Sequence, residues 1–86
     1  MTAAVATMTR DAETLVFRGA LERSAIAALW RQAQALRANM RRLDLIAVSH
    51  VDSAGLALLA ELAGDGIEVL GAPAGLAELR AAYRLD

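Results

Sequence analysis

The hydrophobic pattern of the chain changes its period several times, and each period predicts one kind of element. Residues 14–18 alternate, with Leu15 and Phe17 on one side, as in a strand that is half-buried against a core. Residues 5–9 are the expected hairpin partner of this strand, joined to it across residues 10–13. The pattern defines this N-terminal part poorly, so residues 1–12 could be a strand or a tail. The nearly continuous apolar run 43–48 favours a strand buried on both faces. Residues 67–70 predict another short strand.

Three helices are expected between and after these strands. Residues 24–39 form an amphipathic pattern whose apolar positions are Ile26, Leu29, Trp30, Ala33, Leu36 and Met40. A second helix follows the loop 49–53, where Asp52 or Ser53 can cap it, and ends near Ala63 before Gly64. Pro73 fits the first position of a last helix, whose buried stripe would be Leu76, Leu79, Ala82 and Tyr83.

The order of elements predicts one α/β domain over residues 1–86. Its mixed sheet would consist of an N-terminal hairpin and then parallel strands, because helices separate the later strands. About three helices would cover this sheet.

The second helix has more apolar positions than one face can hold. Residues 56, 59, 60 and 63 share a face that we expect to cover the sheet, so Leu58 and Leu62 project away from it. Unless other helices cover these two leucines, they form an exposed patch of the kind that marks a protein interface. Trp30 lies in the apolar stripe of its helix and could simply belong to the core, but its place beside Arg31 at the edge of the stripe also allows partial exposure at an interface. Gly55, in the first turn, costs about 1 kcal/mol relative to alanine, which indicates close approach by the sheet or by a partner.

Composition narrows the classes of partner. The chain is 57% hydrophobic with a formal net charge of −1, and it has no basic run longer than the Arg41–Arg42 pair. This balance argues against nucleic acid and against a polybasic membrane anchor. Cysteine is absent, which fits a reducing cytoplasm. The uncharged apolar stretch at residues 53–60 is far too short to span a bilayer, and residues 1–10 do not resemble a signal peptide. We therefore expect a cytoplasmic protein that is not inserted in the membrane.

Nothing in the sequence indicates catalysis. His50, Asp52 and Ser53 are the residue types of a hydrolase triad, but neighbours such as Asp52 and Ser53 cannot easily flank one imidazole on opposite sides. No nucleophile elbow and no phosphate-binding loop occurs. His50 has no second histidine or cysteine with which to bind a metal. We predict that the protein is not an enzyme and has no cofactor.

Residues 43–59 resemble the signature of STAS domains, the family named for sulphate transporters and anti-sigma-factor antagonists. The family pattern is an apolar strand, a short loop and then Asp-Ser/Thr-x-Gly-Leu, which falls here on Asp52, Ser53, Ala54, Gly55 and Leu56. Residues 16–21 are similar to the family's early strand and turn. The resemblance covers the chain from about Thr14 onward and implies a STAS-like α/β fold.

Within the family, the chain is most similar to the small MlaB-like STAS subunits of the Mla phospholipid transporter of Gram-negative bacteria. Residues 51–59 and the pair Leu29–Trp30 carry this likeness. It implies a subunit that binds and supports the MlaF-like cytoplasmic ATPase of an ABC permease complex, which maintains outer-membrane lipid asymmetry. The expected partner-binding residues are Trp30, Asp52, Ser53, Gly55, Leu58 and Leu62. An isolated chain could also form a homodimer.

The resemblance leaves an alternative open at Ser53, where that subunit commonly has threonine. In anti-sigma-factor antagonists the matching serine is phosphorylated by a partner kinase, which adds roughly −1.5 to −2 charges. Those antagonists usually carry a second serine where this chain has Ala54. A third, weaker alternative is a lipid- or ligand-binding module, for which the sequence shows no convergent polar pocket.

Overall fold

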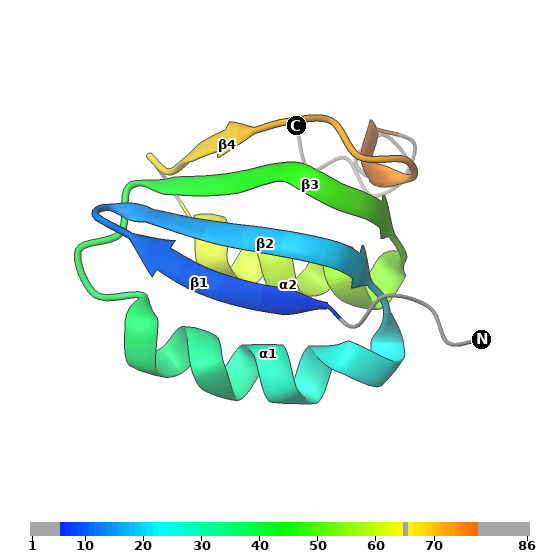
Figure 1. Cartoon of the computed structure of the whole chain (residues 1–86), viewed down its shortest axis with the longest axis horizontal. Coiled ribbons are helices and arrows are strands. Elements are labelled where there is room, and N and C mark those ends of the chain that lie inside the picture. The colour runs from blue at the N-terminus through cyan, green and yellow to red at the C-terminus, as the bar shows by residue number, and fades with distance from the viewer. Residues whose placement is uncertain (1–5, 65, 78–86) are drawn as a thin grey trace.

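The computed structural model describes residues 6–64 and 66–77, and within them four strands form one mixed sheet. The elements, in chain order, are β1 (Thr7–Asp11), β2 (Thr14–Leu21), α1 (Arg23–Leu36), β3 (Arg42–Val51), α2 (Ser53–Ala63) and β4 (Glu68–Leu70). The strand order is β1-β2-β3-β4, in which β1 is antiparallel to β2 and the other neighbours are parallel (Figure 1). The predicted hairpin followed by parallel strands is confirmed.

The N-terminal hairpin is tighter than the sequence pattern predicted. Its strands pair directly up to Asp11 and Thr14, so the turn consists of two residues only. Ala12 in that turn has a φ of 54°, in the left-handed region that two-residue hairpin turns require. The alternation in β2 is confirmed, because Leu15 and Phe17 are fully buried.

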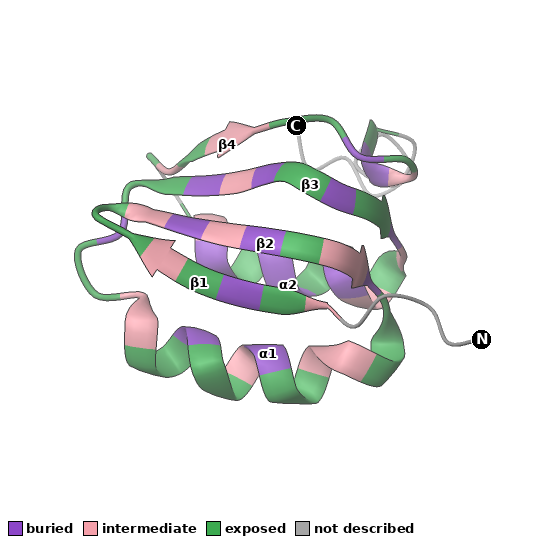
Figure 2. Cartoon of the chain, viewed as in Figure 1, coloured by how far each residue is buried: buried purple, intermediate pink, exposed green. Residues whose placement is uncertain are grey.

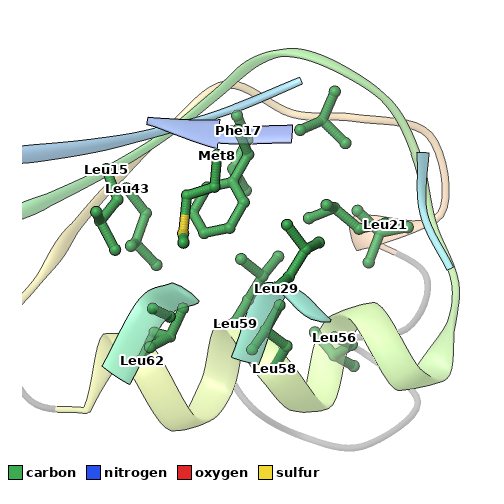
Figure 3. Packing of buried hydrophobic residues seen from close by; sticks show 14 of the residues in the cluster. Met8, Leu15, Phe17, Leu21, Leu29, Leu43, Leu56, Leu58, Leu59 and Leu62 are labelled. Carbon is green, nitrogen blue, oxygen red and sulfur yellow. The ribbon is translucent and has the colours of Figure 1, made fainter. Parts of the chain in front are cut away.

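Both helices lie on the same face of the sheet. In Figure 1, α1 runs beside β1 and α2 passes behind β2 and β3, and each helix contacts the other. Figure 3 shows the buried side chains gathered between α2 and the strands. The buried hydrophobic residues of the core are Met8, Leu15, Phe17, Leu21, Leu29, Ala33, Met40, Leu43, Leu45, Val48, Val51, Leu56, Leu58, Leu59, Leu62 and Leu76.

The prediction that residues 43–48 are buried on both faces of the sheet is wrong. β3 is central, since it pairs with β2 and β4, but Ile46 is 73% exposed and Ala47 is also exposed. In the described residues both helices cover one face, so the other face of β3 remains open to solvent (Figure 2).

Two irregularities in the pairing of β3 decide which positions of its apolar run are buried. Val16 pairs with Asp44 but Arg18 pairs with Ala47, so β3 contains one residue more than β2 over this interval. A second extra residue follows, because Gly19 and Ala20 are consecutive whereas their partners are Val48 and His50. Bulges of this kind shift the alternation of a strand. The buried positions of β3 are therefore Leu43, Leu45, Val48 and Val51, at intervals of two, three and three.

Helix α1 ends three residues earlier than predicted. The Arg10 guanidinium, from β1, donates hydrogen bonds to the carbonyls of Leu36 and Ala38. These contacts satisfy carbonyl groups that a helix leaves free at its carboxyl end. Asn39, three residues beyond the end of α1, adopts a φ of 61° and turns the chain toward β3.

The segment after β4 packs back against the end of β3. The Val51 amide donates to the Ala74 carbonyl, and a Cβ atom at Gly75 would lie only 2.4 Å from the Val51 carbonyl oxygen. Pro73 is in this segment, and helical residues begin only at Leu76. The prediction that Pro73 opens the last helix is therefore wrong. Leu76 is buried as predicted, while Leu79, Ala82 and Tyr83 lie outside the described residues.

Candidate functional site

The carboxylate of Asp52 caps two helices at once. Its Oδ1 accepts a hydrogen bond of 2.9 Å from the Gly55 amide in the first turn of α2. Its Oδ2 accepts one of 3.0 Å from the Arg23 amide, where α1 begins. The predicted capping role of Asp52 is thus confirmed. The residue also joins the amino ends of α1 and α2, which no local sequence pattern indicated.

These hydrogen bonds set the charge state of Asp52. The bond from the Gly55 amide lowers the pKa of Asp52, and weaker contributions from the amides of Arg23 and Ala54 and from nearby His50 act in the same direction. Partial desolvation opposes them without reversing the shift. A carboxylate bound by backbone amides keeps its negative charge because those bonds favour the ionised form. Asp52 is therefore ionised throughout the physiological pH range.

Ser53 is exposed and occupies the first position of α2 rather than the cap. The capping alternative for this residue is wrong, since Asp52 provides the capping oxygen. Ser53 lies one helical turn before Ala57, so both residues are on the same side of α2. Its hydroxyl is available to a partner or to a modifying enzyme.

Gly55 makes a contact inside the domain. The residue is buried, and a Cβ atom there would lie 2.2 Å from the Leu21 carbonyl oxygen at the end of β2. The same carbonyl accepts a hydrogen bond from the Asp52 amide. The close approach indicated by glycine at this position is therefore to the sheet, and any side chain would push α2 away from β2.

The exposed patch predicted at Leu58 and Leu62 does not form. Each leucine is only 3% exposed, and Figure 3 shows both among the side chains that pack beneath the sheet. Helix α1 packs against α2 and, with the strands, covers them. Ala60, which was expected to face the sheet, is exposed instead. The inward face of α2 is thus rotated from the predicted one and contains both leucines.

A shallow apolar groove runs between the two helices where they separate. Ile26 and Trp30 line it from α1, and the lining residues from α2 are Ala54, Ala57, Leu58 and Glu61. Trp30 is half-buried, which agrees with the partly exposed alternative for this residue. Leu58 is therefore part of the groove wall although it belongs to the core, whereas Leu62 contributes only to the core.

Contacts at both ends hold this groove in shape. At the amino end of α1 and α2, the Asp52 carboxylate bridges them as described. At the other end, the Arg37 guanidinium donates a hydrogen bond of 3.3 Å to the Glu61 carbonyl and lies over the Trp30 ring, 5.8 Å from its centroid. Because like ends are joined, the helices run in the same direction, as Figure 1 also shows.

A comparison with protein families decides what kind of domain carries this groove. A family model described as "Mlab, STAS domain" matches residues 4–86. The chain belongs to this MlaB-like STAS family. The STAS-like fold expected from residues 43–59 is thereby confirmed. No curated protein matches the chain in sequence.

The other candidate residues of this STAS domain do not form a catalytic or metal site within the part of the chain that the structure describes. Its His50 Nδ1 lies 3.7 Å from a Glu22 carboxylate oxygen, whereas both oxygens of Asp52 bind backbone amides, so His50, Asp52 and Ser53 are not arranged as a triad. Within residues 6–64 and 66–77, no group of three histidine, cysteine or acidic residues could hold a metal ion. No helix in that part of the chain is long and apolar enough to cross a bilayer.

The STAS-domain groove includes residues that the sequence analysis did not select. Ile26, Ala57 and Glu61 line it, and Arg37 stacks on Trp30 at its end. The spacing of Ile26 and Trp30, four residues apart, places them on one side of α1. No spacing could show which side of α2 faces them, because that depends on how the two helices pack.

Proposed function

We propose that this chain is a non-enzymatic accessory subunit that binds and supports the cytoplasmic ATPase of an Mla-type phospholipid ABC transporter. In this function it contributes to maintaining outer-membrane lipid asymmetry. It would be cytoplasmic, peripheral to the inner membrane through its MlaF-like partner. Membership of the MlaB-like STAS family supports this proposal.

The observation that carries the proposal is the apolar groove with a half-buried tryptophan in its wall. Trp30 presents part of its ring to the groove, and tryptophans in such positions are frequent energetic anchors of interfaces. Exposed Ser53 lies on α2 one turn from Ala57, which lines the same groove. The two positions implied by the resemblance as ATPase contacts therefore belong to one continuous surface.

Docking on this surface would support the ATPase without any chemical step. Filling the groove removes apolar side chains from water, which is the main favourable term in protein association. A subunit that binds only the folded or assembled ATPase shifts its population toward that state. Asp52 and Gly55 contribute indirectly, because they fix where α2 begins relative to α1 and β2.

Substitution of Ser53 tests this surface. Ser53→Glu places a charge at the edge of an apolar contact, and we expect the affinity for the ATPase to fall roughly tenfold or more, which corresponds to at least about 1.4 kcal/mol. Ser53→Ala is the matched control, expected to bind within a few-fold of the original chain. Titration of the purified ATPase measures both variants. Unchanged affinity in Ser53→Glu would show that this position is outside the interface.

The exposure of Ser53 also supports the second candidate, an anti-sigma-factor antagonist regulated by phosphorylation. The hydroxyl is accessible and lies at the amino end of α2, where a phosphate would favourably meet the helix dipole. An affinity pull-down from the native host distinguishes the two functions. Recovery of an ABC ATPase with unmodified Ser53 supports the transporter subunit. Recovery of a kinase-like anti-sigma factor with phosphate on Ser53 supports the antagonist.

A further inference from the structure

The charge around the groove is unevenly distributed between its two walls. Residues 23–40, which include all of α1, contain Arg23, Arg31 and Arg37 and no acidic residue. Helix α2 contains Glu61 as its single charged residue. Within its helical residues the α1 wall therefore contributes only positive charges, whereas the α2 wall contributes Glu61 and the rest of the groove lining is apolar.

Two of these arginines flank Trp30 along the groove. Arg23 and Arg37 are each seven residues from Trp30, nearly two helical turns, so all three lie on the same side of α1. Fourteen residues of helix separate the two arginines, a length of about 21 Å. Arg37 is at the groove itself, since it stacks on Trp30 and binds the Glu61 carbonyl.

The side chains of these arginines are not used by ion pairs in the described residues. The charged contacts found there are Arg41 with Glu13, Arg42 with Glu68 and His50 with Glu22. The backbone amide of Arg23 binds Asp52, which leaves its exposed guanidinium unaffected. In Arg37 one of five N–H donors contacts Glu61. Both guanidinium groups have N–H donors that can bind a carboxylate from a partner.

We infer that the groove binds an acidic amphipathic helix of the partner, with an apolar centre and carboxylates toward both ends. The inference rests on the proposed function and specifies the partner segment that this function requires. Its apolar side chains lie between Trp30 and Ala57, and its carboxylates reach Arg23 and Arg37. A third helix is the natural occupant of a groove between two parallel helices, because an amphipathic helix buries one apolar face along its length.

Charge reversal on α1 tests the inference. In titrations with the purified ATPase at low salt, each lost ion pair is expected to weaken binding roughly two- to fivefold. The double variant Arg23→Glu/Arg37→Glu should therefore lose roughly tenfold in affinity, and the neutral pair Arg23→Gln/Arg37→Gln should lose less. The gap between the reversed and original chains should narrow in high salt, because salt screens exposed charges. A packing effect alone would not depend on salt.

Arg18→Glu is the control for a single charge reversal, since it changes an exposed arginine on the open face of the sheet by the same charge as either Arg23→Glu or Arg37→Glu alone. It should bind within about twofold of the original chain, as exposed rim charges elsewhere have small effects. In parallel, a photo-cross-linking residue at Ala57, which lines the groove, captures the partner segment for mass spectrometry. An acidic segment with an apolar centre is the expected result.

The possible failures are distinguishable. If both double arginine variants bind the ATPase with the affinity of the original chain while Trp30→Ala weakens binding, the acidic-helix inference is overturned and the proposed function stands. Capture of a basic or neutral partner segment by the cross-linker at Ala57 would likewise overturn the acidic-helix inference and leave the proposed function standing. If Trp30→Ala and Ser53→Glu also leave the affinity unchanged, and Ala57 captures no segment, the proposed function itself is overturned.

Discussion

At the scale of single residues, the most consequential atom positions are the two carboxylate oxygens of Asp52. One oxygen holds the first turn of α2 and the other holds the first turn of α1. A neutral side chain of the same shape, asparagine, has one acceptor oxygen and could satisfy only one of the two amides. The requirement for a carboxylate here is thus structural, and it determines where the groove begins.

Asp52→Ala is expected to destabilise the domain by about 1–2 kcal/mol at neutral pH, because it removes a helix cap and a second amide acceptor. Asp52→Asn should lose only part of this free energy of unfolding, because asparagine keeps one acceptor oxygen. Asp11→Ala, which removes a charge at the exposed end of β1, is the control and should be nearly neutral. Urea denaturation measures all three variants.

The effect of Asp52 should depend on pH with a definite sign. Its pKa is lowered in the folded state, so the stabilisation it provides is complete above the unfolded pKa of about 3.9. That stabilisation is lost as the pH falls through the lower, folded pKa. The original chain and Asp52→Ala should therefore converge in stability in strong acid. A constant difference between pH 7 and acid would show that charge is not involved.

At the scale of elements, the parallel pair α1 and α2 behaves as one structural unit. Asp52 joins the amino ends of the helices and Arg37 joins the carboxyl half of α2 to the end of α1. Leu58 and Leu62 fill the space between this pair and the sheet, which is why the patch predicted at these leucines is internal. The interface left on this side is the groove rather than the leucine patch.

Leu62→Ala separates core from interface, because Leu62 is 3% exposed and does not line the groove. We expect a loss of about 2–5 kcal/mol in unfolding free energy from the lost burial and the cavity. Ile46→Ala, which shortens a side chain that is 73% exposed, should change stability by less than about 0.5 kcal/mol. Urea denaturation checks both variants. A small loss for Leu62→Ala would mean that the leucine is not packed as the structure places it.

At the scale of the whole molecule, sixteen buried hydrophobic side chains in the described residues form one cluster on one face of the sheet. The central strands β2 and β3 contribute seven of these sixteen side chains, and each pairs with a strand on both sides. β1 and β4 are edge strands with one neighbour. Separating β2 from β3 would consequently expose more apolar surface than separating an edge strand.

Amide hydrogen exchange should reflect this arrangement. The slowest exchange is expected in β2 and β3, around Leu15, Phe17 and Leu45, because these amides open only with the whole core. The amides of β1 should exchange faster, since this edge strand can separate first. Measurement by NMR or mass spectrometry checks the order. Slower exchange in β1 than in β3 would contradict the single-core description.

The sequence alone determined features that depend on neighbours in the chain. The alternation at Leu15 and Phe17, the helical period of residues 24–39 and the Asp52 cap act within a few residues. Local periodicity and capping are readable for that reason. The motif that begins at Asp52 also identified the family correctly, since its residues are contiguous.

Only the tertiary structure decided which faces are covered. The run 43–48 suggested burial on both sides. Two bulges in β3 instead shift the alternation of the strand, so that Ile46 within the run faces solvent. Leu58 and Leu62 turned inward because α1 packs beside α2, and Arg37 reached the Glu61 carbonyl for the same reason. Burial depends on which elements pack against one another. A local sequence pattern predicts the buried face only when a strand is regular or when a helix has a single apolar face.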